Sequence, residues 1–252
     1  MKKLVLRLLN WWGYEARARA VLPWAFSLET DLEKLGLDAA AVDTVLDVGA
    51  NVGEHARAFA RAFPRATVHA FEPVAATHRR LSAAVADQPR IRPHCLALSD
   101  ADGPATIALS DNDTINSLEG INPKFGASTG EEVIQRERLD AWLDREGVAR
   151  VDLLKLDVEG HELAALEGAR GVLAAGRIRF LLIETKGVRA EEVRSVGTSL
   201  VELEALLAPL GYRLLVLYTD YLHLPPKPFH SNFNALFGRV EGAAASRSTA
   251  TS

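Results

Sequence analysis

The 252-residue chain contains a single cysteine, so it cannot form an internal disulfide and offers no thiol cluster to a metal ion. That residue, Cys95, lies in an apolar stretch, which predicts a buried and unreactive thiol. The chain also lacks an apolar run of the roughly 20 residues that a membrane-spanning helix needs. We therefore expect a protein of the cytoplasm.

An excess of basic residues is missing as well. Lysine and arginine together number 29 against 33 aspartates and glutamates, which gives a net charge of −4. This balance produces no general positive field that would attract nucleic acid. The composition, 48% apolar and 25% charged, is ordinary for a globular protein, and the length suffices for one large α/β domain. We expect a small-molecule partner and no nucleic acid, and the oligomeric state stays open.

The main glycine turn does not have the Gly-x-Gly-x-x-Gly spacing that is typical of dinucleotide-binding folds. Instead, an apolar run over 44–48 stops at Gly49, a second glycine follows at Gly53, and apolar residues then recur at helical spacing. A strand, a glycine turn and a helix in this order open a nucleotide crevice in doubly wound sheets. Glycines let the backbone lie against a ligand, and the amides at the helix start point into the crevice. We therefore predict four cofactor-binding residues in this turn, namely Gly49, Ala50, Asn51 and Gly53.

Acidic residues near this turn indicate which cofactor binds. Asp47 would repel the pyrophosphate of a dinucleotide, whereas its carboxylate suits the sulfonium and ammonium groups of S-adenosylmethionine. A second apolar run ends at Glu72, about 20 residues beyond the turn, where a ribose-binding carboxylate is expected. The alternative is a glycine turn in some other α/β protein, with Glu72 merely solvated. The combination favours an S-adenosylmethionine pocket and disfavours a dinucleotide-dependent oxidoreductase.

Apolar runs alternate with helical spacing along the chain and predict an α/β fold. We expect a Rossmann-like, seven-stranded, mostly parallel sheet with helices on both faces. A short strand at 105–109 would begin an added hairpin, and the polar segment 110–130 has a length typical of functional or disordered loops. The expected organisation is a helical lead-in over 1–41, one domain over 42–240 and a disordered tail over 241–252. The seven strands are expected near 44–48, 67–72, 91–98, 151–157, 179–185, 212–218 and 233–237.

Polar or acidic residues stand at the ends of five of these runs. Because ligands bind beyond the carboxyl ends of parallel strands, these side chains should share one rim, and its four carboxylates suit a cation. If the last strand is antiparallel, the loop with His223, Lys227 and His230 opens at the same rim; we favour a stiff surface loop there over a substrate lid. The five rim residues are Asp47, Glu72, Ser99, Asp157 and Glu184, of which the first four are predicted to bind the cofactor.

The first 20 residues combine basic side chains with apolar ones at helical spacing. Positions 4, 5, 8, 9 and 12 are apolar, and basic residues flank them. A signal peptide is disfavoured, because Arg7 interrupts the apolar core while Arg17 and Arg19 crowd the cleavage site. Two interpretations remain. We favour an amphipathic helix packed on the domain over a helix that lies on an anionic membrane surface.

Four segments of the chain resemble the FkbM-type methyltransferases. They are Asp47–Gly53, Phe71–Pro73, Ala97–Asp100 and Asp152–Glu162, and the Lys-x-Asp-x-Glu-Gly-x-Glu pattern in the last is the most specific. The resemblance, which spans about residues 42–238, implies a class I methyltransferase fold with S-adenosylmethionine as the donor. It also implies O-methylation of a hydroxyl on a small metabolite such as a sugar or a polyketide. The acceptors of this family are diverse, so the resemblance does not identify the acceptor.

Candidates for catalysis lie where the strand at 151–157 turns into its helix, beside the expected methyl group. Asp157 would bond the methionine ammonium or the acceptor hydroxyl. Glu159 and His161 are candidates for the base that removes the acceptor's proton, and Lys155 could lower the pKa of a neighbouring group. The alternative is that Glu159 and Glu162 favour the helix N-terminus electrostatically while His161 is exposed.

Metal-dependent catalysis is an alternative at the same place, since Asp157, Glu159 and His161 could all be ligands. Catechol-type enzymes add an acid–amide pair at the next strand end, where this chain has Glu184 and Thr185, so we expect no metal. Two alternatives to O-methylation also stay open. They are N-methylation in the same pocket and a catalytically silent protein that binds S-adenosylmethionine.

Overall fold

The computed structural model describes residues 22–112, 116–121, 126–188, 197–219 and 233–239. The predictions for the N-terminal helix, for the tail beyond residue 240 and for the loop with His223, Lys227 and His230 lie outside these residues. None of the described helices is both long and apolar enough to cross a bilayer. The cytoplasmic location stays a prediction.

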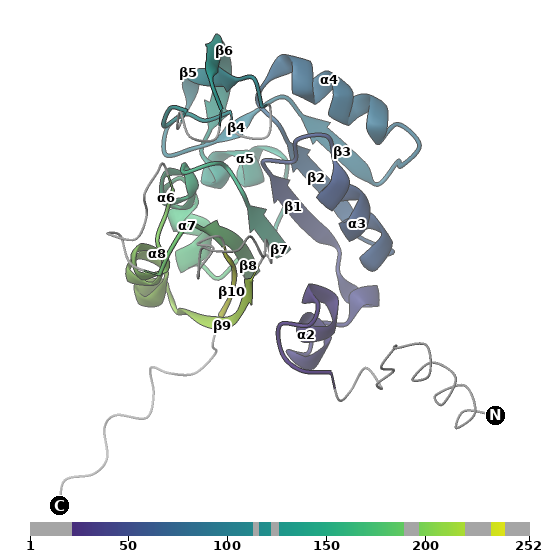
Figure 1. Ribbon diagram of the computed structural model, residues 1–252. Coiled ribbons are helices and arrows are strands. Elements are labelled where there is room, and N and C mark those ends of the chain that lie inside the picture. Colours follow the sequence, from purple (N-terminus) through teal and green to yellow (C-terminus); the bar gives the residue numbers. More distant parts are fainter. Residues whose placement is uncertain (1–21, 113–115, 122–125, 189–196, 220–232, 240–252) are drawn as a thin grey trace, which may run out of the picture.

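A seven-stranded sheet forms the centre of the molecule, as the sequence predicts (Figure 1). The strand order is β3-β2-β1-β7-β8-β10-β9. Neighbouring strands pair in parallel except where β10 lies between β8 and β9. The strands are β1 (Thr44–Val48), β2 (Thr67–Phe71), β3 (Ile91–His94), β7 (Val151–Leu156), β8 (Ile178–Thr185), β9 (Tyr212–Thr219) and β10 (Phe233–Arg239).

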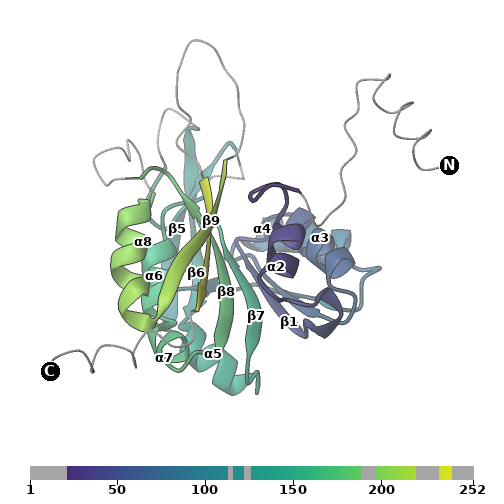
Figure 2. The same ribbon diagram turned by 90° about the horizontal axis from the view of Figure 1, so that it is seen from below.

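Helices cover both faces of this sheet and bury a separate apolar cluster on each (Figure 2). One face carries α2 (Leu28–Lys34), α3 (Glu54–Ala62) and α4 (Ala75–Ala84). The other carries α5 (Leu139–Arg145), α6 (Glu162–Glu167), α7 (Arg170–Ala174) and α8 (Leu200–Leu207). Successive residues of β1 belong to different clusters. Val45 packs in the cluster under α2, α3 and α4, and Leu46 packs in the cluster under α5 to α8. Strands buried on both faces present apolar residues to both clusters, which explains their largely apolar runs.

The helical segment after His161 is divided into α6 and α7. Gly168 ends α6 where the chain passes the backbone of Ser99, and a Cβ at this glycine would lie 1.8 Å from the Ser99 carbonyl oxygen. The Asp140 carboxylate then accepts hydrogen bonds from the amides of Gly171 and Val172 at the start of α7. Short 3₁₀ turns at Ala39–Ala41 and Ala208–Leu210 complete the described helical segments.

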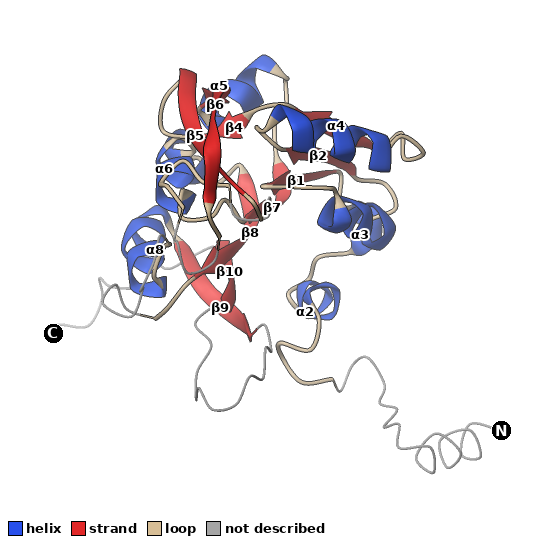
Figure 3. Cartoon of the chain, turned by 45° about the horizontal axis from the view of Figure 1, so that its top comes forward, coloured by secondary structure: helices blue, strands red, loops and turns tan. Residues whose placement is uncertain are grey.

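The stretch 91–98, predicted as one strand, contributes to two sheets. β3 lies at the edge of the main sheet, and β4 (Ala97–Leu98) joins a small sheet with β5 (Gly103–Ser110) and β6 (Ser128–Glu137). The predicted strand at 105–109 is confirmed within β5. Cys95 lies in the link between the two sheets and is exposed, so the prediction of a buried thiol is wrong. Figure 3 shows the small sheet beside the ends of β1 and β7.

The central parallel strands end level with one another. Val48 of β1 lies opposite Phe71 of β2 and Leu156 of β7, and Leu156 in turn lies opposite Ile183 of β8. The residues at or just beyond these positions therefore share one edge of the sheet. Glu72, Asp157 and Glu184 stand there as predicted, whereas Ser99 follows β4 of the small sheet.

Candidate active site

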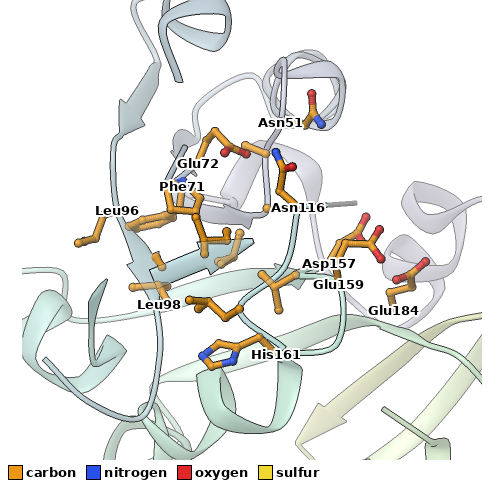
Figure 4. A pocket seen from close by; sticks show the side chains of 18 of the residues that line it. Asn51, Phe71, Glu72, Leu96, Leu98, Asn116, Asp157, Glu159, His161 and Glu184 are labelled. Atoms are coloured by element: carbon orange, nitrogen blue, oxygen red, sulfur yellow. The ribbon is translucent and has the colours of Figure 1, made fainter. Parts of the chain in front are cut away.

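A pocket of about 330 Å³ opens at this edge of the sheet (Figure 4). This volume falls within the range of small-molecule sites, roughly 300–1,000 Å³. The ends of β1, β2, β7 and β8 supply part of its wall, and the small sheet with residues 116 and 118 supplies another part. Its polar lining residues are Asn51, Glu54, Glu72, Asn116, Asp157, Glu159, His161 and Glu184.

The glycine turn after β1 packs closely against two neighbouring strands. The amides of Gly49 and Ala50 both donate to the carbonyl of Phe71, at 3.1 and 2.9 Å. Gly49 has a φ of +79°, and a Cβ there would lie 1.8 Å from the backbone oxygen of Asp157. Gly53, with a φ of +89°, is the residue before α3. Residues 49–52 line the pocket, whereas Gly53 does not line it and closes the turn by donating a 2.8 Å hydrogen bond to the carbonyl of Ala50.

Glu72 follows β2 and presents an oriented carboxylate. Its side chain is nearly buried, lines the pocket, and accepts a hydrogen bond of 3.0 Å from the amide of Val74. The sequence predicts a ribose-binding acid at this position, and the structure places Glu72 in the lining of the same pocket as the glycine turn.

Lys155 lies between two carboxylates at the end of the central strands. Its Nζ is 3.0 Å from Oδ2 of Asp157 and 3.7 Å from Oδ1 of Asp47. Burial by itself lowers the pKa of Lys155, but attraction to Asp157 and Asp47 outweighs it and the pKa is raised. Burial likewise raises the pKa of Asp157, but Lys155 outweighs it and the pKa is lowered. This pairing keeps Asp157, which lines the pocket, in its ionised form.

Asp47 is fully buried and does not line the pocket. No described side chain or amide donates a hydrogen bond to its oxygens, and burial raises its pKa above the ordinary value. Its described ionic contact is with Lys155, the residue opposite it in the β1–β7 pairing. Asp47 therefore lies behind the pocket wall and pairs with Lys155, which in turn pairs with Asp157.

Three carboxylates converge beyond β7 and β8. One oxygen from each of Asp157, Glu159 and Glu184 lies within 4.8 Å of the others. Lys186 Nζ contacts Oε2 of Glu159 and lies 3.8 Å from Oε2 of Glu184. Burial raises the pKa of Glu159, and burial together with the charge of Asp157 raises that of Glu184 to about 8. Three such carboxylates could hold a divalent cation, and the absence of a metal requirement stays a prediction.

His161 is nearly buried at the start of α6, so the alternative of an exposed histidine is wrong. Its Nε2 lies 2.9 Å from Oγ of Ser99, and its Nδ1 lies 2.8 Å from Oε1 of Glu119. Both ring nitrogens thus face protein groups, although the ring borders the pocket. His161 links β4, α6 and the segment around Glu119, and Ser99 contacts this histidine without lining the pocket.

The predicted site residues divide into pocket-lining residues and residues that support them. Glu184 was predicted at the rim without a role, while Lys186, Glu119, Asn116 and Leu118 were not predicted. The polar loop 110–130 was the only signal for the last three, because no motif singles them out. The predicted residues that line the pocket are Gly49, Ala50, Asn51, Glu72, Asp157, Glu159 and His161; those behind the wall are Asp47, Gly53, Ser99 and Lys155.

The strand order and the glycine turn at its centre define a class I methyltransferase, an enzyme class that uses S-adenosylmethionine as methyl donor. The Methyltransferase FkbM domain matches residues 47–214, and the chain belongs to this family. The resemblance drawn from the sequence is thereby confirmed. The matched range lies inside the expected domain of residues 42–240, whose outer limits stay a prediction.

A curated relative is the AMB antimetabolite synthetase AmbE of Pseudomonas aeruginosa. It is 29% identical over 181 residues, which cover 58% of this chain. The same match covers 8% of AmbE, so the chain corresponds to a small part of that protein.

Several solved structures are distantly similar to the chain. A fibrillarin pre-rRNA processing protein of Methanococcus jannaschii has 13% identity and a TM-score of 0.49, over 81% of this chain and 69% of that one. A TehB-like S-adenosylmethionine-dependent methyltransferase of Corynebacterium glutamicum has 12% identity and a TM-score of 0.45, over 95% and 96%. Fibrillarin of Aeropyrum pernix, crystallised with S-adenosylmethionine, has 19% identity and a TM-score of 0.45, over 80% and 68%. The family match, rather than these distant likenesses, identifies the chain.

Proposed function

We propose that this methyltransferase transfers the methyl group to the oxygen of a hydroxyl on a small metabolite. The main support is that the carboxylates of Asp157, Glu159 and Glu184 lie close together at the pocket. A hydroxyl becomes a good nucleophile only when its proton leaves, and a carboxylate in hydrogen-bond reach assists that step. An amine would instead be held in its protonated, non-nucleophilic form by the negative charges of Asp157 and Glu159. The site therefore favours an oxygen acceptor over a nitrogen acceptor.

The pocket residues fit S-adenosylmethionine as the donor. The backbone of residues 49–51 would lie along the methionine part, because these residues line the pocket together with Asp157, against whose backbone Gly49 packs. The Glu72 carboxylate would bond the ribose hydroxyls, and ionised Asp157 would attract the ammonium group. When bound, this cofactor supplies an activated methyl group on its sulfonium. The contribution of the chain is to orient the donor and the acceptor for in-line transfer.

Glu159 is the base in this proposal. Its carboxylate lines the pocket, its ion pair with Lys186 favours the charged form, and its burial raises the pKa, which makes the carboxylate a stronger base. His161 is less suited to this role, since its two nitrogens face Ser99 and Glu119. The similarity to an antimetabolite synthetase supports a natural product as the acceptor.

A methyl-transfer assay with labelled donor and a panel of sugars, polyketide alcohols and amines tests the proposal. We expect transfer to hydroxyl oxygens that persists in EDTA. Glu159→Gln should lower turnover about a hundredfold or more, because the amide cannot take the proton. Glu131→Gln, at an exposed position of β6, is the matched control and should retain the normal rate. Full turnover by Glu159→Gln, or transfer to amines alone, would contradict the proposal.

A further inference from the structure

We infer that Ser117 is a positioning residue for Glu159, and that residues 116–119 couple occupancy of the pocket to the conformation of the turn at 158–161. The inference rests on the role proposed for Glu159. The segment comes from the polar loop between β5 and β6, far from the FkbM motif residues in sequence.

The segment 116–119 faces the pocket and the turn with alternate residues. Asn116 and Leu118 line the pocket, whereas Ser117 and Glu119 contact the turn after β7. Ser117 Oγ donates a 2.7 Å hydrogen bond to the carbonyl of Glu159, and Glu119 lies 2.8 Å from His161. Ser117 forms an isolated β-bridge with Ala108, and the chain turns at Leu118 and Glu119, so this division of contacts comes from a local turn. Figure 4 shows Asn116 among the pocket residues.

Ser117 is itself firmly held. It is nearly fully buried, and its backbone exchanges two hydrogen bonds with Ala108 of β5, at 3.0 and 3.2 Å. Its hydroxyl therefore reaches Glu159 from a fixed support in the small sheet. A buried hydroxyl on a backbone that is bridged to β5 loses little freedom when it donates, so the hydrogen bond can hold the backbone of the turn.

The turn needs such support, because Glu159 adopts an unfavourable backbone conformation. Its φ is +52°, in the left-handed region that residues other than glycine rarely occupy, and Gly160 follows with a φ of +100°. From the side of α6, the Glu162 carboxylate accepts hydrogen bonds from the amides of Val158 and Gly160, at 3.3 and 3.1 Å. From the side of β5, the Ser117 hydroxyl donates to the carbonyl of Glu159, which lies between these two amides. The two together fix the direction of the Glu159 carboxylate.

A molecule that contacts Asn116 and Leu118 packs against the segment that places Ser117 on the turn. The donor and the acceptor would both enter the pocket that these residues line, so binding should further stabilise the Ser117 contact and the turn before transfer. The contact made by Ser117 then affects the rate of transfer more than the affinity for the donor.

Hydrogen exchange of the full chain, followed by mass spectrometry with and without S-adenosylhomocysteine, tests the inference. In the wild type, the product should slow exchange over residues 158–161. In Ser117→Ala, exchange there should be about tenfold faster, and the product should slow it less. Ser117→Thr retains a hydroxyl and should restore the wild-type pattern. Ser128→Ala, an exposed serine of β6, is the matched control and should match the wild type.

Wild-type exchange over 158–161 in Ser117→Ala, with a full response to the product, would overturn the inference. If Ser117→Ala also accelerates exchange in β1, the variant is unfolding, and Glu119→Ala, at a half-exposed position, takes its place with the same expected direction. The exchange measurement requires no methyl transfer. A Glu159→Gln variant with full turnover would therefore refute the proposed base while leaving the result for Ser117 intact.

Discussion

Lys155 shows how single residues depend on partners in this site. A lysine buried without compensation would lose its charge, yet this one lies between Asp47 and Asp157 on adjacent strands. Removing one partner of a buried ion pair typically destabilises a protein by about 3–5 kcal/mol, because the remaining charge is left unpaired. The sequence predicts that Lys155 acts on a neighbouring group. It does not show that Asp47 is that lysine's second partner rather than a pocket residue.

The close packing of Gly49 predicts a large loss of stability when a side chain is added there. Gly49→Ala should lower the free energy of unfolding by at least about 3 kcal/mol, because its φ is +79° and the new Cβ would lie 1.8 Å from the Asp157 carbonyl oxygen. Gly103→Ala is the matched control, since Gly103 also has a positive φ but no atom within 4 Å of the new Cβ. The control should cost about 1–2 kcal/mol. Urea unfolding measures both, and equal losses would contradict the close approach.

Among the elements, buried parallel strands follow from the sequence most directly. β7 is apolar at four of six positions and buried throughout, so its run and its terminal acid are both visible in the sequence. The stretch 91–98 is less informative, because nothing in its apolar pattern indicates that the chain changes sheets at Cys95. The turn after β7 is recognised by its motif, but its support by Ser117 is not, since that contact joins residues 42 positions apart.

A histidine pair joins β2 to β3 within the core. His69 Nδ1 lies 3.0 Å from His94 Nε2, and both rings meet the edge of Trp142. Burial, followed by the proximity of His94, lowers the pKa of His69 to about 4, and burial lowers the pKa of His94 as well. Both imidazoles are therefore neutral in the folded protein at pH 7.

This pair should make the protein sensitive to acid. The unfolded chain takes up a proton at His69 near pH 6.5 and the folded protein only near pH 4, so the free energy of unfolding falls as the pH drops between these values. The expected loss from His69 is about 2–3 kcal/mol at pH 4. Urea unfolding between pH 7.5 and 4.5 should show a shallower decline for His69→Phe than for the wild type. Parallel declines would refute the assignment.

In the molecule as a whole, local motifs and long-range contacts contribute different parts of the site. The glycine turn, Glu72 and the Asp157–Glu159 turn are each recognisable over a few residues, and the parallel sheet brings them to one edge. The wall formed by Ile107 of β5 with Asn116 and Leu118 of the loop between β5 and β6 becomes part of the pocket only through tertiary packing. Lys186 similarly meets Glu159 only because β7 and β8 are neighbours.

A calorimetric titration distinguishes a pocket for a sulfonium methyl donor from a pocket for a dinucleotide. The full chain is titrated with S-adenosylhomocysteine and, separately, with NAD. Asp157→Asn serves as the pocket variant and Asp144→Asn, at an exposed position of α5, as its matched control. We predict binding of one S-adenosylhomocysteine per chain, weakened in Asp157→Asn and unchanged in Asp144→Asn, with no binding of NAD. Binding of NAD without binding of S-adenosylhomocysteine would contradict a pocket built for a sulfonium methyl donor.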